Sequence, residues 1–118
     1  MKNFELFFGN LGNGTTVCNK AVEENGDYKK IAHISKGGNI TLYVDKAYIP
    51  VTEMKKIESM AIRDKKQFQA CFERLPLIEQ YRKIIDWAPL KTLVDFLNDK
   101  RTLEEKVPEM REYYYTLI

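Results

Sequence analysis

Three turn-forming dipeptides at twelve-residue intervals constrain the fold of this chain more than any other feature. They are Asn13-Gly14, Asn25-Gly26 and Gly37-Gly38. Asn-Gly and Gly-Gly pairs favour the positive φ angles that both central residues of a type I′ hairpin turn require. The segments between and after them are rich in Val, Ile, Thr and Tyr, which are common in strands. The spacing therefore predicts a four-strand antiparallel β-meander in the N-terminal half.

Two-residue turns also fix which residues face each other on neighbouring strands. The predicted cross-strand pairs are Phe8–Asn19, Asn19–Ala32, Ala32–Tyr43 and Cys18–His33.

Side chains alternate between the two faces of a sheet, so this register also sorts them by face. The more aromatic face carries Phe4, Leu6, Phe8, Tyr28 and Tyr43 and is expected to be partly exposed, although the twist of a small sheet can also leave both faces partly covered. The more aliphatic face is expected to pack against helices. It holds Phe7, Leu11, Cys18, Val22, Ile31, His33, Ile40, Leu42 and Val44.

The second half of the chain shows helical periodicity. Apolar residues recur at helical spacing from Met54 to Leu75, and Thr52 is a suitable N-cap, so a helix is predicted over about 52–75. Pro76 and Pro89 are each expected to open a further helix.

The last apolar pattern predicts one more helix near the C-terminus. Thr102 and Glu105 have the spacing of a capping box. Pro108 is expected to interrupt this helix, and the tyrosines that follow are expected either to form an interface or to dock on the chain's own core.

These patterns predict an α+β fold in a single domain, residues 1–118. A β-meander occupies 1–49, and a helical half, 50–118, supplies three to four helices packed on one face of the sheet. No segment approaches the roughly 20 apolar residues of a membrane span, and no secretory leader is recognised. Cys18 and Cys71 form neither a disulfide framework nor a metal-ligand pattern. A cytoplasmic protein without metal or cofactor is expected.

A basic stripe on the long helix is the first candidate binding site. At 100° per residue its members share one face, opposite the apolar stripe. Such a face can bind an acidic protein or phosphates, although many basic faces are only solvated. Reversing the charge of Arg63 and Lys66 is expected to weaken partner binding, and the aromatic face around Phe8, Tyr28 and Tyr43 is the alternative surface. The stripe consists of Lys55, Lys56, Arg63, Lys66 and Arg74.

A catalytic reading rests on Cys18 and His33, which the predicted register places opposite each other. A thiol beside an imidazole can act as a nucleophile with its base. No orienting carboxylate or oxyanion-hole loop accompanies them, so no catalytic residue is assigned.

The chain resembles a group of short modules found on phages and conjugative elements of Gram-positive gut bacteria, alone or within large polyvalent mobile-element proteins. The resemblance covers roughly residues 4–45 and rests on three stretches: GNLGNG from Gly9, NGDY from Asn25 and IAHI from Ile31. It implies an accessory protein of a mobile genetic element and supplies no catalytic residue.

The leading functional hypothesis is therefore a non-enzymatic binding protein that acts on a larger host or phage protein or nucleoprotein complex. Inhibitors of host defence, such as anti-CRISPR proteins, are small proteins of that setting. One alternative is a nucleic-acid-binding accessory protein that uses the basic helix, and another is a small Cys-His enzyme.

Overall fold

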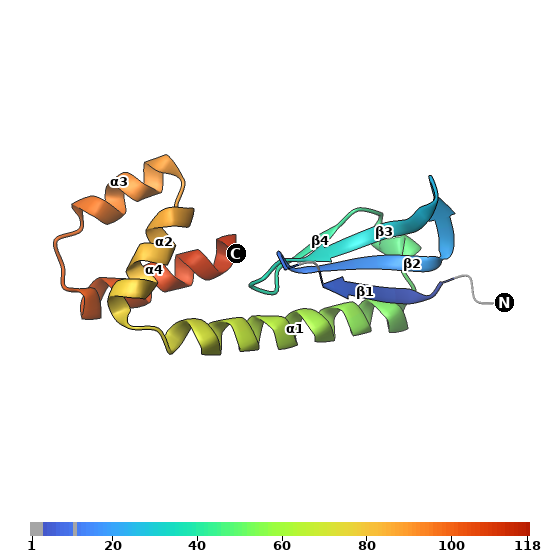
Figure 1. Ribbon diagram of the computed structural model, residues 1–118, viewed down its shortest axis with the longest axis horizontal. Helices are drawn as coiled ribbons and strands as arrows, with labels where there is room; N and C mark the ends of the chain where they lie inside the picture. The colour runs from blue at the N-terminus through green and yellow to red at the C-terminus, as the bar shows by residue number, and fades with distance from the viewer. Residues whose placement is uncertain (1–3, 11) are drawn as a thin grey trace. The chain divides into compact units, whose positions relative to one another are not determined.

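The computed structural model describes residues 4–10 and 12–118. Within them, a four-stranded antiparallel sheet in the order β1-β2-β3-β4 precedes four α-helices, which confirms the predicted α+β class (Figure 1). The elements are β1 (Leu6–Asn10), β2 (Thr15–Glu24), β3 (Asp27–Ile34), β4 (Ile40–Leu42), the 3₁₀ helix η1 (Lys46–Tyr48), α1 (Val51–Glu73), α2 (Leu77–Trp87), α3 (Leu90–Asn98) and α4 (Leu103–Leu117).

The chain divides into two compact units, which we call unit 1 (Met1–Lys66) and unit 2 (Gln67–Ile118). The division falls inside α1, whereas the sequence places the change from strands to helices near residue 50. The helical residues in the core of unit 1 come from the first part of α1. The other helices contribute to the core of unit 2, together with the last turns of α1.

The core of unit 1 forms where α1 packs on the sheet (Figure 1). Phe4, Leu6 and Phe8 pack at the margin of this core from the β1 side, and Ile40 and Leu42 do so from β4. Its buried members are Val17, Ile31, Ala32, Ile34, Ile49, Met54, Ile57 and Ala61.

The register of the sheet differs from the prediction because only one of the three turns has the predicted form. Asn25 and Gly26 have φ angles of 54° and 82°, as a type I′ turn requires. Asn13 has no positive φ, and Asn10 pairs with Thr15, so the first loop has four residues. The observed pairs include Phe8–Val17, Val17–Ala32, Thr16–His33 and Ala32–Leu42.

The predicted assignment of faces is wrong for β1, where Phe7 is exposed and Leu6 and Phe8 pack at the core, whereas Ile31, Ile40, Leu42 and Val44 lie in or against the core as expected. Ile34 pairs with Ile40, which is one residue away from the expected register, and a one-residue slip turns every side chain of a strand to the other face. Ile40 and Leu42 therefore lie on the same side as Ala32 and Ile34, facing α1. Leu11, also expected on the aliphatic face, lies outside the described residues.

A buried asparagine joins β1 to an irregular part of β2. The pairing between β2 and β3 shifts between Asn19 and Glu23. Asn19 is fully buried, and its Oδ1 accepts hydrogen bonds from the backbone N–H of Glu5 at 2.9 Å and of Ala21 at 3.0 Å. The asparagine side chain thus satisfies a donor inside the bulge and holds the residue just before β1 in place.

The core of unit 2 contains the tyrosine-rich tail. Tyr114 and Tyr115 are buried, and the rings of Phe72 and Tyr114 lie 5.0 Å apart. The tail was predicted either to form an interface or to dock on the chain's own core, and these two tyrosines dock on the core. The buried members of this core are Phe72, Ile84, Met110, Tyr114, Tyr115 and Ile118.

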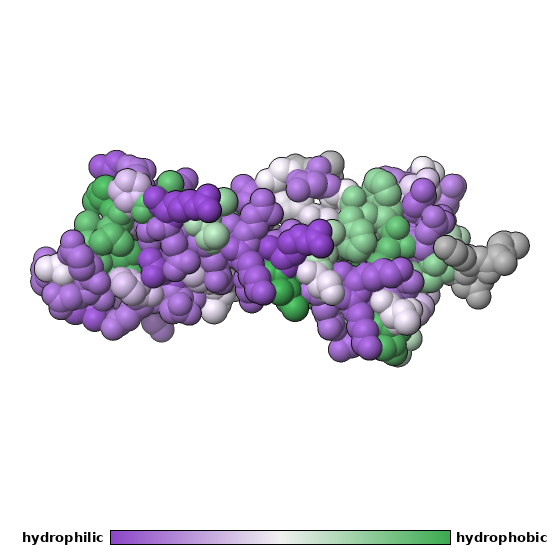
Figure 2. Space-filling model, turned by 90° about the horizontal axis from the view of Figure 1, so that it is seen from below, coloured by the Kyte–Doolittle hydropathy of each residue, from purple (hydrophilic) through white to green (hydrophobic). Residues whose placement is uncertain are grey.

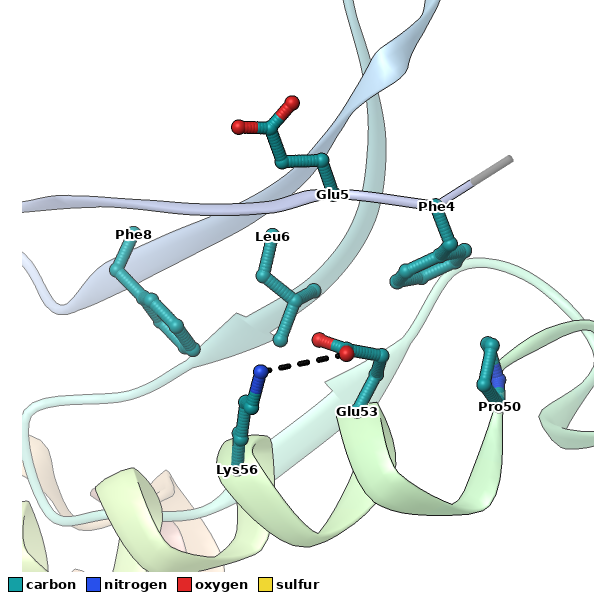
Figure 3. Close-up of a pocket in the computed structure, with 7 residues that line it drawn as sticks. All are labelled: Phe4, Glu5, Leu6, Phe8, Pro50, Glu53 and Lys56. Carbon is teal, nitrogen blue, oxygen red and sulfur yellow. Dashed lines mark hydrogen bonds and ion pairs between the residues drawn. The ribbon is translucent and has the colours of Figure 1, made fainter. Parts of the chain in front are cut away.

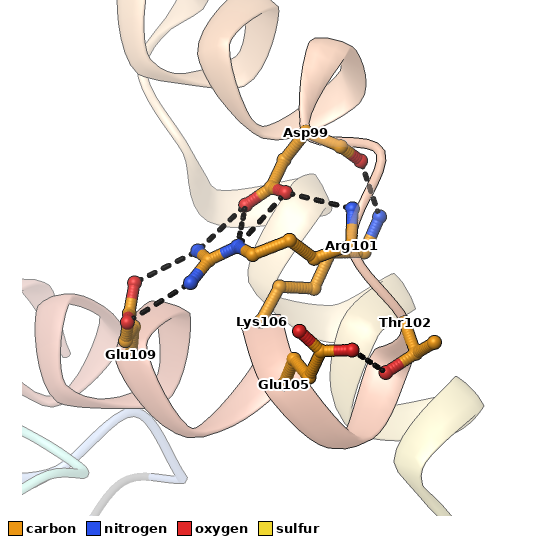
Figure 4. Close-up of polar contacts among 6 residues, drawn as sticks. All are labelled: Asp99, Arg101, Thr102, Glu105, Lys106 and Glu109. Atoms are coloured by element: carbon orange, nitrogen blue, oxygen red, sulfur yellow. Dashed lines mark hydrogen bonds and ion pairs between the residues drawn. The ribbon is translucent and has the colours of Figure 1, made fainter.

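The predicted cap of the last helix is confirmed only in part. Thr102 is the N-cap of α4, and its hydroxyl donates to Glu105 Oε1 at 3.0 Å, but its side chain makes no bond to the helix backbone (Figure 4). The helix continues through Pro108, where the sequence predicted an interruption. A proline in the second turn removes a single helical hydrogen bond, and burial of Val107 and Met110 favours continuation.

A charged cluster closes the loop between α3 and α4 (Figure 4). Arg101 Nη2 donates to Asp99 Oδ2 and to Glu109 Oε2, both at 2.8 Å. Hydrogen bonding to Arg101 lowers the pKa of Asp99 to about 2 and also lowers the pKa of Glu109. Lys106 Nζ donates to the backbone oxygen of Asp99 at 3.0 Å. The charges of Asp99, Arg101 and Glu109 are paired with one another, which indicates a structural contact between the loop and α4.

Candidate functional site

A groove runs between β1 and α1 within unit 1. Its first section has a volume of about 530 Å³, and Figure 3 shows Leu6 and Phe8 of β1, and Phe4 just before it, pointing toward α1 there. A second section of about 340 Å³ continues along α1. Both sections share Phe8 and Lys56, so we treat them as one β1–α1 groove. It is lined by Phe4, Glu5, Leu6, Phe8, Pro50, Glu53, Lys55, Lys56, Ser59, Met60 and Arg63.

The two walls of the groove follow from simple periodicities. Strand alternation places Phe4, Leu6 and Phe8 on one side, while the exposed Glu5 points away from α1 (Figure 3). Residues three, four and seven apart share one side of a helix, so Lys56, Met60 and Arg63 lie along the same side of α1. The groove therefore has an apolar strand wall and a mixed, largely polar helix wall.

The charges on the helix wall are unevenly distributed. Glu53 lies toward the Pro50 end and pairs with Lys56, with 3.3 Å between Oε1 and Nζ. Lys55 and Arg63 line the second section, and neither forms an ion pair within the described residues. The section beside Phe8 is therefore electropositive and offers cationic groups to a ligand.

Strand β1 is an edge of the sheet, and its outer side adjoins this groove. The N–H of Lys20 donates to the carbonyl of Glu5 at 2.7 Å, as in a hydrogen-bonded pair, while the N–H of Glu5 donates to Asn19 Oδ1 instead. Such pairs alternate along an antiparallel ladder, so Phe7 and Gly9 also direct their backbone groups toward β2. Leu6 and Phe8 consequently direct their N–H and C=O groups away from β2, toward the open edge.

The structure places the predicted basic stripe as follows. All five side chains are exposed. Lys55, Lys56 and Arg63 line the groove, and Lys66 is the last residue of unit 1. Arg74 lies one residue beyond the end of α1 and belongs to unit 2, so it is not part of the same helical face. The sequence extended the stripe to Arg74 because it predicted a helix that ended two residues later.

The alternative aromatic surface is divided between the two faces of the sheet. Phe8 points toward α1 (Figure 3). The ring of Tyr28 instead lies beside that of Phe7, tilted by 59° with ring centres 6.2 Å apart, and Lys20 Nζ lies 5.9 Å from the centre of each ring. Tyr43 follows β4 and is 56% exposed. The three residues therefore do not form one binding surface.

Sequence reasoning missed the groove although its signal was present. The alternation of Phe4, Leu6 and Phe8 was recognised, but the wrong face was assigned to the helices. Met60 lies on the side of α1 that faces the groove, although it belongs to the apolar residues at helical spacing between Met54 and Leu75.

The predicted Cys-His pair does not form. Cys18 pairs with Lys30, whereas His33 pairs with Thr16 and its Nε2 lies 3.3 Å from the backbone oxygen of Asn13. Burial raises the pKa of the Cys18 thiol, and Asp27 raises it further. A raised pKa reduces the thiolate fraction at neutral pH, which is the opposite of what a cysteine nucleophile needs.

The reaction rates of the two cysteine thiols test whether Cys18 is an activated nucleophile. At pH 7, Cys18 in a Cys71→Ser variant should react with a thiol reagent more slowly than the exposed Cys71 does in a Cys18→Ser variant. The rate at Cys18 should rise as the pH increases, because more thiolate forms. Labelling can be followed by mass spectrometry. If Cys18 reacted faster than Cys71 at pH 7, the conclusion that Cys18 is not an activated nucleophile would be contradicted.

The surface around α1 is mostly hydrophilic, with hydrophobic patches between the polar side chains (Figure 2). In the part of the chain that the structure describes, no helix combines the length and the hydrophobicity needed to cross a membrane. Among the same residues, no group of three or more His, Cys, Asp or Glu side chains is arranged to hold a metal ion. Comparison of the chain with protein-family models, curated proteins and solved structures gives no match.

Proposed function

We propose that this chain is a non-enzymatic binding protein that holds a segment of a larger protein in the β1–α1 groove. The observation that carries the proposal is the combination of an open strand edge, an apolar wall and an electropositive section in one continuous groove. Apolar area supplies binding energy, and fixed charges along the groove select and orient the partner.

The resemblance of residues 4–45 to mobile-element modules supports a matching cellular role. In this proposal the partner belongs to the host or to the element itself, for example a protein of a host defence complex, and the chain acts in the cytoplasm by occupying it. Nucleic acid is the second candidate, because four basic residues of α1 are exposed on one face.

A photo-crosslinking residue placed in the groove tests the proposal. Benzoylphenylalanine at Ser59 should crosslink to a protein when the chain is produced in its native host, and the product should be sensitive to protease but not to nuclease. Ser59 lines the groove, while the exposed Lys30 on β3 pairs with Cys18, is not among the lining residues and provides the control position.

Two charge variants complete this experiment. The groove variant Lys55→Glu/Arg63→Glu should lose the Ser59 crosslink. The control variant Lys83→Glu/Lys100→Glu, which makes the same change in net charge at exposed positions of unit 2, should retain it. A nuclease-sensitive product, or binding to an oligonucleotide that weakens steeply as salt rises, would instead favour the nucleic-acid function. Equal crosslinking at Ser59 and Lys30 would contradict both.

A further inference from the structure

Strand β1 carries no Lys, no Pro and no bulge, three of the features that commonly protect an edge strand. Edge strands are commonly blocked by Lys, Pro, a bulge or a covering segment. The sequence of β1 is LFFGN, its pairing with β2 is regular, and no other strand among the described residues pairs with it. The other edge, β4, has only three residues. The longer edge is thus the one beside the groove.

We propose that the partner adds an extended acidic segment to β1 as a fifth strand of the sheet. This inference rests on the proposed function and specifies the shape and chemistry of what the groove holds. Backbone hydrogen bonds to an exposed edge supply the affinity in this mode of recognition, and pockets for alternate side chains supply the specificity.

The backbone of β1 determines how such a strand is aligned. Leu6 and Phe8 direct their N–H and C=O groups outward, so the added strand forms its hydrogen bonds with these two residues. Segment residues opposite Leu6 and Phe8 point their side chains to the same face as those residues, which is the face covered by α1. Residues two apart in the segment therefore enter the groove, and the residue between them points to the other face.

The charges of the groove select the side chains that enter it. Near Phe8 the groove presents Lys55, Lys56 and Arg63, so an Asp or Glu is favoured there. Near Phe4 and Leu6 the helix wall presents Glu53, so an apolar residue against the strand wall is favoured at that end. The bound segment is thus apolar at one inward position and acidic at the next.

A second copy of this chain is a poorer occupant than an acidic segment. Two β1 strands that pair antiparallel across a twofold axis keep the same face of both sheets on one side. The two α1 helices would then bring their basic groove residues toward each other, and like charges repel. Charge complementarity therefore favours an acidic partner.

Selection from a random twelve-residue peptide library on the full-length chain provides the probe. Peptides that bind are expected to carry Asp or Glu two residues away from an apolar residue. For a synthetic peptide of this kind, the groove variant Lys55→Glu/Arg63→Glu should weaken the Kd by about tenfold or more. The control variant Lys83→Glu/Lys100→Glu should leave the Kd unchanged. Fluorescence anisotropy measures both.

Amide hydrogen exchange then identifies strand addition. In the free chain the amides of Phe7 and Gly9 should be protected and those of Leu6 and Phe8 should exchange rapidly. Adding the peptide should protect Leu6 and Phe8. If binding of the peptide depended on the groove charges but left these two amides unprotected, strand addition would be overturned and the proposed function would remain intact.

Two other outcomes would also overturn this inference. Protection of Leu6 and Phe8 in the free chain, together with a dimer in sedimentation, would show that a second copy occupies the edge. Selection of no peptide that distinguishes the wild-type chain from the groove variant would show that no short extended segment is recognised. The crosslinking experiment at Ser59 decides the proposed function separately, because it does not require a short linear segment.

Discussion

Replacing Gly38 with alanine is expected to lower the free energy of unfolding of unit 1 by about 3 kcal/mol or more, because backbone strain and a steric clash add. Gly38 has a φ of +83°, in the left-handed region that favours glycine. A Cβ at this position would contact the backbone oxygen of Ala61 and would lie 2.6 Å from Lys65 Cβ. The loop between β3 and β4 can approach α1 this closely only without a side chain.

Gly26 provides a matched control for this substitution. Its φ of +82° is almost the same, but a Cβ there would meet nothing within 4 Å. Gly26→Ala should therefore cost only the conformational strain, about 1–2 kcal/mol. Urea unfolding of both variants, followed by circular dichroism, measures the difference. Equal losses in the two variants would show that the loop does not pack against α1 as described.

Replacing Ile57 with alanine should cost about 2–5 kcal/mol, since it removes a buried side chain and leaves a cavity. Ile57 is fully buried where α1 packs on the sheet. Amide exchange of β2 and β3 should accelerate together with the loss of stability, because these strands share the same core.

The control for this prediction lies on the same helix. Ile62 is 57% exposed, so Ile62→Ala removes the same atoms but creates no buried cavity. Its cost should stay below about 1 kcal/mol. A larger effect at Ile62 than at Ile57 would mean that the other side of α1 covers the sheet.

The sequence predicted the class of the fold because turn chemistry and apolar periodicity are local signals. The strand order and α1 followed from residues that act within a few positions of one another, such as Asn25 with Gly26. The register did not follow, because loop lengths around Asn13 and Gly38 depend on contacts with distant residues. Gly38, for instance, lies against Ala61.

The groove could be predicted only in part for the same reason. Lys55, Lys56 and Arg63 were selected correctly as neighbours on one exposed helical face, a property that helical spacing determines. Their position beside Phe8 depends on which sheet face α1 covers. A one-residue difference in the pairing of β3 with β4 reverses the face to which Ile40 and Leu42 belong, and turn composition alone does not determine it.

The buried side chain of Asn19 has a consequence for conformational entropy. Its Oδ1 fixes the N–H of Glu5, and the pairing with β2 fixes the residues that follow, so β1 is ordered before any segment arrives. Ordering one backbone residue costs about 1–2 kcal/mol, and in the proposed complex that cost would fall on the incoming segment alone. A segment that is already extended in the partner, such as a constrained loop, should therefore bind more tightly than the same residues in a disordered tail.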